Sequence, residues 1–146
     1  MVDYKPMQVN DLKMKMTYNQ GKNNCEGLAV RVHGVVKGIV VDASSCCFFI
    51  SFVKDLYVEM NEYNNRLLSM LRASQDTESI VYVYGHVAKI ADEKGLMKKL
   101  VAHKIDFNDY TIESKKTIDD YVKQQGLTTS LTTNQQTDDG EEILNP

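Results

Sequence analysis

The 146-residue sequence has few cysteines and no long apolar run. Its three cysteines are an odd number, and Cys46 and Cys47 are adjacent, a spacing that rarely forms a disulfide and matches no metal site. We therefore expect reduced intracellular thiols that pack as small hydrophobic side chains. No stretch approaches the roughly 20 apolar residues of a membrane helix, and the first residues do not resemble a secretory signal. These absences argue against a secreted, disulfide-stabilised or membrane-spanning protein.

The sequence also has no excess of positive charge, since its net charge is −3 at pH 7. The acidic residues are concentrated at the end, where residues 127–146 hold four carboxylates and no lysine or arginine. Without this tail the net charge is +1, from 17 basic and 16 acidic residues. A nearly neutral folded part argues against a protein that holds nucleic acid by charge alone.

The motifs of common enzyme classes are missing as well. Gly34 and Gly38 lack the spacing and the Lys-Ser/Thr of a phosphate-binding loop, and no serine lies in a recognisable nucleophile motif. His33 and His86 are expected on polar strand faces, where they could approach each other, but neither has further metal ligands at suitable spacing. His103 is expected to pack in a half-buried position. We therefore expect no catalysis, no metal and no cofactor.

The strongest pattern in the chain covers residues 79–106 and predicts a β-hairpin. Apolar and larger polar residues alternate in its first half, which is the period of a strand, because successive side chains point to opposite sides of a sheet. Residues 91–95 supply the turn and residues 96–105 the returning strand. The buried face would carry Val81, Val83, Gly85 and Val87, and the opposite face Tyr82, Tyr84 and His86.

Earlier strands are predicted at residues 27–42 and 46–53, with a shorter one at 56–58. Gly34 and Gly38 interrupt the first of these, and glycines inside a strand predict a bulge or bend that lets one long strand serve two sides of a small barrel. Near the N-terminus, Leu12, Met14 and Met16 alternate, which allows a short strand or an extended arm.

Two helices complete the expected elements. Residues 59–73 carry apolar side chains at three- and four-residue spacing, and residues 111–125 carry a narrow apolar face. Residues 1–126 should therefore form one domain, followed by a disordered, threonine-rich and acidic tail at 127–146. The element order predicts an all-β fold with flanking helices: a five-stranded OB barrel with a helix before the last hairpin and a C-terminal helix.

Residues 81–122 resemble the end of OB domains in the middle and small subunits of replication protein A, and are similar to the small telomere-capping subunits of the CST complex. Gly85 matches the family glycine, residues 100–105 match a Leu-Val-Ala-x-Lys-Ile strand, and Asp106 and Asp109 match its acidic positions. Residues 30–36 resemble the opening strand. One departure is the short strand expected at 56–58, because the central strand of the family often carries aromatic residues that contact nucleic acid.

The resemblance implies a non-catalytic subunit of a single-stranded DNA-binding complex, acting in replication, repair or telomere maintenance. Such a protein would be nuclear, or cytoplasmic if it is bacterial or viral, with a protein partner and no membrane association. The C-terminal helix would contact the partner through Ile118, Tyr121 and Val122, or would fold back on its own barrel. A stand-alone binder of single-stranded nucleic acid and an OB protein adaptor are the alternative functions.

Candidate nucleic-acid contacts follow from the chemistry of single-strand binding, which uses aromatic rings for stacking and cations along the backbone. Tyr82 and Tyr84 supply rings on one strand face, although tyrosines are also enriched at protein interfaces. Because the domain is nearly neutral, we expect this subunit to contribute a few weak contacts. The cations expected nearby are Arg31, Lys37, Lys89, Lys98, Lys99 and Lys104.

Overall fold

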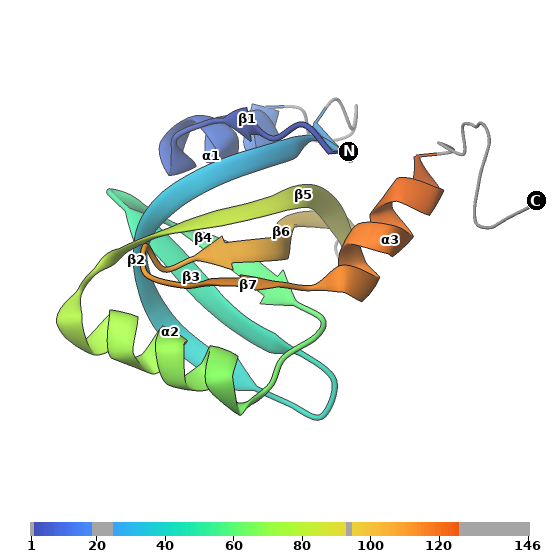
Figure 1. Cartoon of the computed structure of the whole chain (residues 1–146). Coiled ribbons are helices and arrows are strands. Elements are labelled where there is room, and N and C mark those ends of the chain that lie inside the picture. Colours follow the sequence, from blue (N-terminus) through green and yellow to red (C-terminus); the bar gives the residue numbers. More distant parts are fainter. Residues whose placement is uncertain (1, 19–24, 93–94, 126–146) are drawn as a thin grey trace, which may run out of the picture. The chain divides into compact units, whose positions relative to one another are not determined.

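The computed structural model (Figure 1) describes residues 2–18, 25–92 and 95–125, and these residues fall into two units that divide after Ser114. The predicted tail at 127–146 lies outside the described residues. The second unit contains helix α3 (Lys115–Gln124). The elements of the first unit are β1 (Lys5–Pro6), α1 (Val9–Tyr18), β2 (Ala29–Val41), β3 (Cys46–Phe52), β4 (Lys54–Met60), α2 (Asn65–Thr77), β5 (Ile80–Asp92), β6 (Gly95–Asp106) and β7 (Thr111–Glu113).

Five strands close into a barrel in the order β2–β3–β4–β6–β5, and β5 pairs with β2 to complete the circle. Neighbouring barrel strands are antiparallel except β4 and β6, which are parallel. Along the chain, α2 stands between the third and fourth barrel strands. This is the closed five-stranded barrel of an OB fold with flanking helices, so the predicted fold class is confirmed. β1 and β7 are short additions beside β2 and β6.

Strand β2 serves two sides of the barrel, as its glycines predicted. Its first half pairs with β5 and its second half with β3, and both pairings include Val35. At Gly34 the neighbouring strand comes so close that a Cβ would lie 2.4 Å from the carbonyl oxygen of Ser51. The register then shifts between Lys37 and Val40, around Gly38 with a φ of +61°. Both glycines therefore permit the bend that closes the barrel.

The hairpin of β5 and β6 has the two faces that its alternation predicted. Val81, Val83 and Val87 are at most 1% exposed, whereas Tyr82 and Tyr84 are half-buried on the outer face. The register shifts once. Tyr84 pairs with Lys104 but Gly85 pairs with Ala102, so His103 is an extra residue in a β-bulge of β6.

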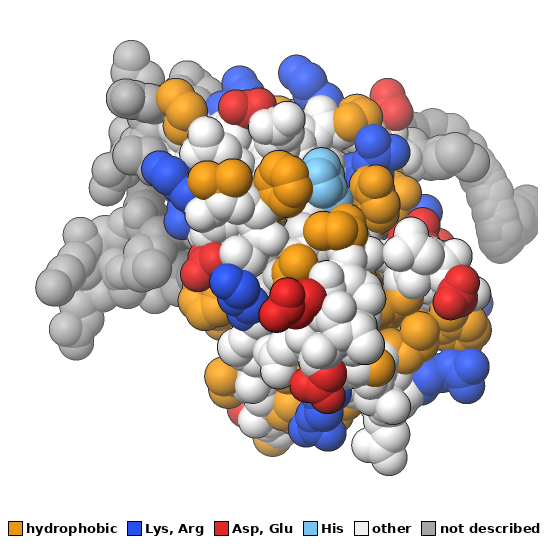
Figure 2. All heavy atoms as spheres, turned by 90° about the vertical axis from the view of Figure 1, so that its left-hand side faces the viewer, with side chains coloured by type: hydrophobic (Ala, Val, Ile, Leu, Met, Phe, Trp, Pro, Cys, Tyr) orange, Lys and Arg blue, Asp and Glu red, His pale blue; other side chains and the backbone are white. Residues whose placement is uncertain are grey.

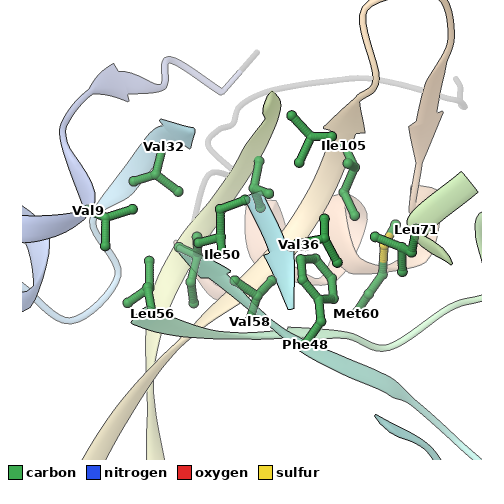
Figure 3. Close-up of a cluster of buried hydrophobic side chains, with 14 of the residues drawn as sticks. Val9, Val32, Val36, Phe48, Ile50, Leu56, Val58, Met60, Leu71 and Ile105 are labelled. Carbon is green, nitrogen blue, oxygen red and sulfur yellow. The ribbon is translucent and has the colours of Figure 1, made fainter. Parts of the chain in front are cut away.

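The core fills the barrel, and helices close its two ends. Figure 3 shows Val9 of α1 at one end of the buried cluster and Leu71 of α2 at the other, with Phe48 and Ile50 of β3 between them. All four side chains are completely buried. α1 contacts β2, β3 and β4, and α2 contacts β2. The interior of the barrel is therefore filled with side chains, and only the outer face of the sheet is open to other molecules.

The predicted position of the first helix is wrong by six residues at its start. Glu59 and Met60 belong to β4, where Glu59 pairs with Cys47 and Met60 is completely buried. Helix α2 begins only after Asn64, whose side chain accepts a hydrogen bond from the Leu67 amide at 2.9 Å. The helix then runs through Thr77, four residues beyond the predicted end. The residue that caps it has a left-handed backbone conformation.

Two further segments also differ from prediction. Residues 9–18 form a helix, so the expected strand or extended arm at Leu12, Met14 and Met16 is wrong there. Residues 111–113, expected to begin the last helix, instead pair with β6 as β7, and α3 starts at Lys115. Among the described residues, no helix combines the length and apolar composition needed to span a membrane.

Candidate functional site

Two tyrosines predicted as stacking residues lie side by side on the outer face of β5, and each has a cation over its ring. The guanidinium of Arg31 lies 5.4 Å from the ring centre of Tyr82. The ammonium of Lys104 lies 4.2 Å from the ring centre of Tyr84, whose ring is also met edge-on by Tyr4 at 5.3 Å. The structure therefore brings two of the six predicted cations to the tyrosines.

The other four predicted cations lie elsewhere. Lys89 forms an ion pair with Glu26 at 3.6 Å, and Lys99 forms an ion pair with Glu59. Lys98 donates to the carbonyl oxygen of Met16 at 3.3 Å. Lys37 lies on the second half of β2, opposite Phe49 of β3. These cations do not form one basic strip with the tyrosines.

An aromatic cluster extends from Tyr82 across β2 to the end of β3. The ring of His33 lies 5.4 Å from that of Tyr82 and 4.9 Å from that of Phe52. Phe52 is 38% exposed and was not among the predicted site residues. We call His33, Phe52 and Tyr82 the β2–β5 aromatic cluster.

A groove of about 530 Å³ opens beside this cluster, between the N-terminal segment and β2. Figure 2 shows one face of the molecule on which hydrophobic side chains surround a histidine, with lysine or arginine side chains close by. The groove carries three cations, one carboxylate and His33, which the aromatic cluster shares. Its lining residues are Lys5, Pro6, Met7, Gln8, Asp11, Lys15, Arg31 and His33.

A second aromatic pair lies on the outer face of β3 and β4. Phe49 and Tyr57 are opposite each other in the strand register, with ring centres 5.7 Å apart and planes at 63°. Phe49 is 38% exposed and Tyr57 is half-buried. A hydrogen bond with Cys47, followed by burial and nearby negative charge, raises the pKa of Tyr57 to about 12, so its ring stays neutral.

This β3–β4 face corrects the expectation of a short third strand. β4 spans seven residues and carries an aromatic side chain, whereas the strand predicted from the sequence covered only residues 56–58. Outer-face positions of the second and third barrel strands are those that OB folds use for oligonucleotides. Charges beside the pair are mixed, because Lys37 lies opposite Phe49 while Glu59 is paired with Lys99.

A hydrogen-bonded chain of polar side chains links the N-terminal segment to the last hairpin, with the buried His103 between the half-buried Tyr4 and His86. The hydroxyl of Tyr4 lies 2.7 Å from Nδ1 of His103, and Nε2 of His103 lies 2.6 Å from Nδ1 of His86. His103 is completely buried rather than half-buried. The predicted approach of His33 and His86 is not found, because His86 contacts His103 and His33 lies opposite Tyr82. Burial lowers the pKa of His86 to about 4 and that of His103 to about 3, and Lys99 and His86 respectively add to the two shifts.

Other reactive side chains form no recognisable centre in the part of the chain that the structure describes. No three metal-ligating side chains come together among those residues. All three cysteines are free thiols, and burial raises the pKa of Cys46 to about 11, which disfavours a reactive thiolate.

The three residues predicted to contact a partner lie on α3 of the second unit. Ile118, Tyr121 and Val122 are spaced three and four residues apart, so they share one face of this ten-residue helix. Acidic residues at 119 and 120 lie outside that face. The helix is therefore amphipathic, as its sequence predicted.

Comparisons with known proteins find likeness in structure but not in sequence. No protein-family model matches the sequence, and no curated protein matches it. An OBody bound to hen egg-white lysozyme is 17% identical with a TM-score of 0.45, over 58% of this chain and 85% of the OBody. A second OBody bound to hen egg-white lysozyme is 21% identical with a TM-score of 0.43, over 60% and 84%.

Asparaginyl-tRNA synthetase from Pyrococcus horikoshii, in complex with asparaginyl-adenylate, is 16% identical with a TM-score of 0.48. The match covers 74% of this chain but only 23% of the synthetase. None of these identities is high enough to carry a function to this chain.

Proposed function

We propose that this chain is a non-catalytic OB-fold module that binds single-stranded nucleic acid across its β3–β4 face. The observation that supports the proposal is the pair of neighbouring rings, Phe49 and Tyr57, on the outer face of the second and third barrel strands. Each base has a flat π-face, so aromatic rings on the surface of a sheet bind single strands with little regard to sequence.

The charges around this face favour weak binding. Lys37 is exposed beside Phe49, but Lys99 is already paired with Glu59, and Asp55 adds a negative charge on β4. The binding energy would therefore come mainly from stacking, at about 1–3 kcal/mol per base, with few phosphates neutralised. Such a module contributes contacts to an assembly more readily than it binds alone.

Replacing Phe49 or Tyr57 with alanine should weaken binding of a fluorescein-labelled 15-nucleotide dT or rU strand about fivefold each. This is the lower end of the stacking range, because Tyr57 is half-buried and offers only part of its ring. Fluorescence anisotropy at 50 mM and 200 mM salt measures the affinity. Tyr110→Ala is the matched control, since this ring is 40% exposed and contacts Arg66 of α2.

The outcomes of that titration separate the candidate functions. Equal losses in Tyr110→Ala and the two face variants would mean that the β3–β4 face is not the site. A wild-type affinity that falls steeply with salt would favour a stand-alone binder that works by charge. No binding at either salt concentration would favour a protein adaptor.

We further propose that the module is a subunit of a nuclear assembly like replication protein A or the telomere-capping complex. The resemblance of residues 81–122 supports this proposal, together with the amphipathic face of α3. A ten-residue helix is too short to be stable alone in water, so its apolar face needs a packing surface. Tyr121 is already only 7% exposed within the chain, whereas Ile118 and Val122 are half-buried, so a partner subunit would cover the part of the face that is still open.

Charged substitutions on the apolar face of α3 test the partner. Ile118→Glu with Tyr121→Glu should abolish co-purification of a stoichiometric partner, because burying two carboxylates is unfavourable. Lys116→Glu with Lys123→Glu adds as many carboxylates on the opposite, exposed side of the helix and should retain the partner. Thermal unfolding by circular dichroism checks that the barrel still melts cooperatively. Unchanged partner recovery in the first variant would mean that α3 is not the contact.

A further inference from the structure

The groove between the N-terminal segment and β2 has built walls. β1 pairs in parallel with β2, and the amide of Met7 donates to the carbonyl oxygen of Arg31 at 3.0 Å. On its other side, α1 is held to the β3–β4 hairpin, where Lys13 donates to the carbonyl oxygen of Asp55 at 2.6 Å. Its volume of about 530 Å³ is that of a small-molecule or nucleotide site.

The charge of the groove favours an anion. Lys5, Lys15 and Arg31 line it, against the single carboxylate of Asp11. Within the described part of the chain, no ion pair joins any of the three cations to a carboxylate. No carboxylate of the described residues therefore neutralises these cations through an ion pair, and a phosphate group would complement their charge.

His33 joins the groove to the β2–β5 aromatic cluster. It lines the groove, and its ring also contacts those of Phe52 and Tyr82. A ligand with a phosphate in the groove would thus have an exposed ring, that of Phe52, within reach of its next group. Cations beside an aromatic platform are the combination that single-stranded nucleic acid requires.

The cluster also continues the β3–β4 face. Phe52 follows Phe49 on the same strand by three residues, which is about 10 Å along a β-strand. Phe52 leaves the pattern of alternation at the hairpin, where Val53 has a φ of 70°, and its ring meets His33 of β2. One strand of nucleic acid could therefore contact both surfaces in succession.

We propose that this groove and the β2–β5 aromatic cluster form a second contact site for the same single strand. The groove holds a phosphate between Lys5, Lys15 and Arg31, and the preceding or following base stacks on Phe52 beside His33. This inference rests on the proposed function for its ligand class and adds the path of the nucleic-acid strand, from the outer face of β3 to that of the neighbouring β2.

Charge and ring variants separate the two parts of this site. Lys5→Gln with Lys15→Gln should reduce the slope of log affinity against log salt by about 0.7, because the groove holds one phosphate and each neutralised phosphate on a single strand adds about that much. Phe52→Ala should weaken binding about fivefold without changing that slope. The probe is the same 15-nucleotide labelled strand, measured between 25 mM and 250 mM salt. Arg72→Gln on α2 is the charge control, because α1 and α2 lie at opposite ends of the barrel.

Each outcome decides between the two proposals. If the groove variants behave like Arg72→Gln and Phe52→Ala binds like wild type, the second site is wrong while the β3–β4 site can stand. If these variants lose binding but Phe49→Ala and Tyr57→Ala do not, the groove is the site and the β3–β4 proposal is wrong. Absence of binding by the wild-type chain at 25 mM salt would overturn both.

Discussion

Replacing Gly85 with alanine should lower the free energy of unfolding by about 3–5 kcal/mol, a large part of the stability of a domain this size. A Cβ at this position would lie 2.1 Å from the carbonyl oxygen of Val101 and 2.9 Å from its carbonyl carbon. Both are backbone atoms of β6, so they cannot move without separating the two strands. Urea unfolding followed by circular dichroism measures the loss.

Gly38→Ala is the matched comparison, because the obstacle there is different. Gly38 has a φ of +61°, and its added Cβ would meet only the ring of Phe49 at 3.3 Å. The ring can shift, so the main cost is the left-handed backbone, about 1–2 kcal/mol. A smaller loss for Gly85→Ala than for Gly38→Ala would contradict the close approach of β5 and β6.

The sequence predicted the parts of the fold where one periodicity leaves no alternative. Alternation over 79–90 is long enough to exclude a helix, and the structure confirms both the strand and its buried face. Gly34 and Gly38 likewise predicted the bend of β2, because few other reasons place two glycines inside an apolar strand. The order of these elements along the chain predicted the OB fold class, which the structure confirms.

The helices were harder to place, because short segments fit two periodicities. Leu12, Met14 and Met16 alternate as in a strand, but Val9, Leu12 and Met16 also recur at helical spacing. Packing decides between them, since Val9 and Leu12 are completely buried against the barrel. Likewise Met60 fits the helical stripe of α2, yet pairing with Cys46 places it in β4.

The candidate site was predicted only in part, because it depends on register between strands. Tyr82 and Tyr84 share a face by alternation alone, and that face is confirmed. The contact between the rings of Phe49 and Tyr57 depends on the register that the β3–β4 turn sets. The contact between Phe52 and His33 depends on the register of β2 and β3, which shifts near Gly38. Sequence alone does not fix such registers. The sequence did contain one usable signal for the site, because aromatic residues stand at outer-face positions of the apolar strands.

Acidification from pH 7 to pH 5 should destabilise the barrel by about 2–3 kcal/mol through His86 and His103. Burial lowers the pKa of both in the folded chain, to about 4 and about 3, from an unfolded value near 6.5. Between these values the unfolded chain binds more protons than the folded chain, so stability falls as the pH falls through this window. If both histidines were fully shielded from water, the barrel would lose more stability than this. His86 is only half-buried, so solvent reduces the effect.

Urea unfolding at pH 7, 6 and 5 measures this dependence, and variants identify its source. His86→Gln with His103→Gln keeps hydrogen-bonding side chains but removes both titrating groups, so its stability should be nearly constant over this range. His33→Ala should keep the dependence of the wild type, because His33 lies outside the buried pair. Asp42, whose pKa the amides of Ser44 and Ser45 lower from 3.8, stays ionised above pH 5 and does not contribute. Equal pH dependence in the double variant and the wild type would mean that burial does not keep His86 and His103 neutral in the folded chain.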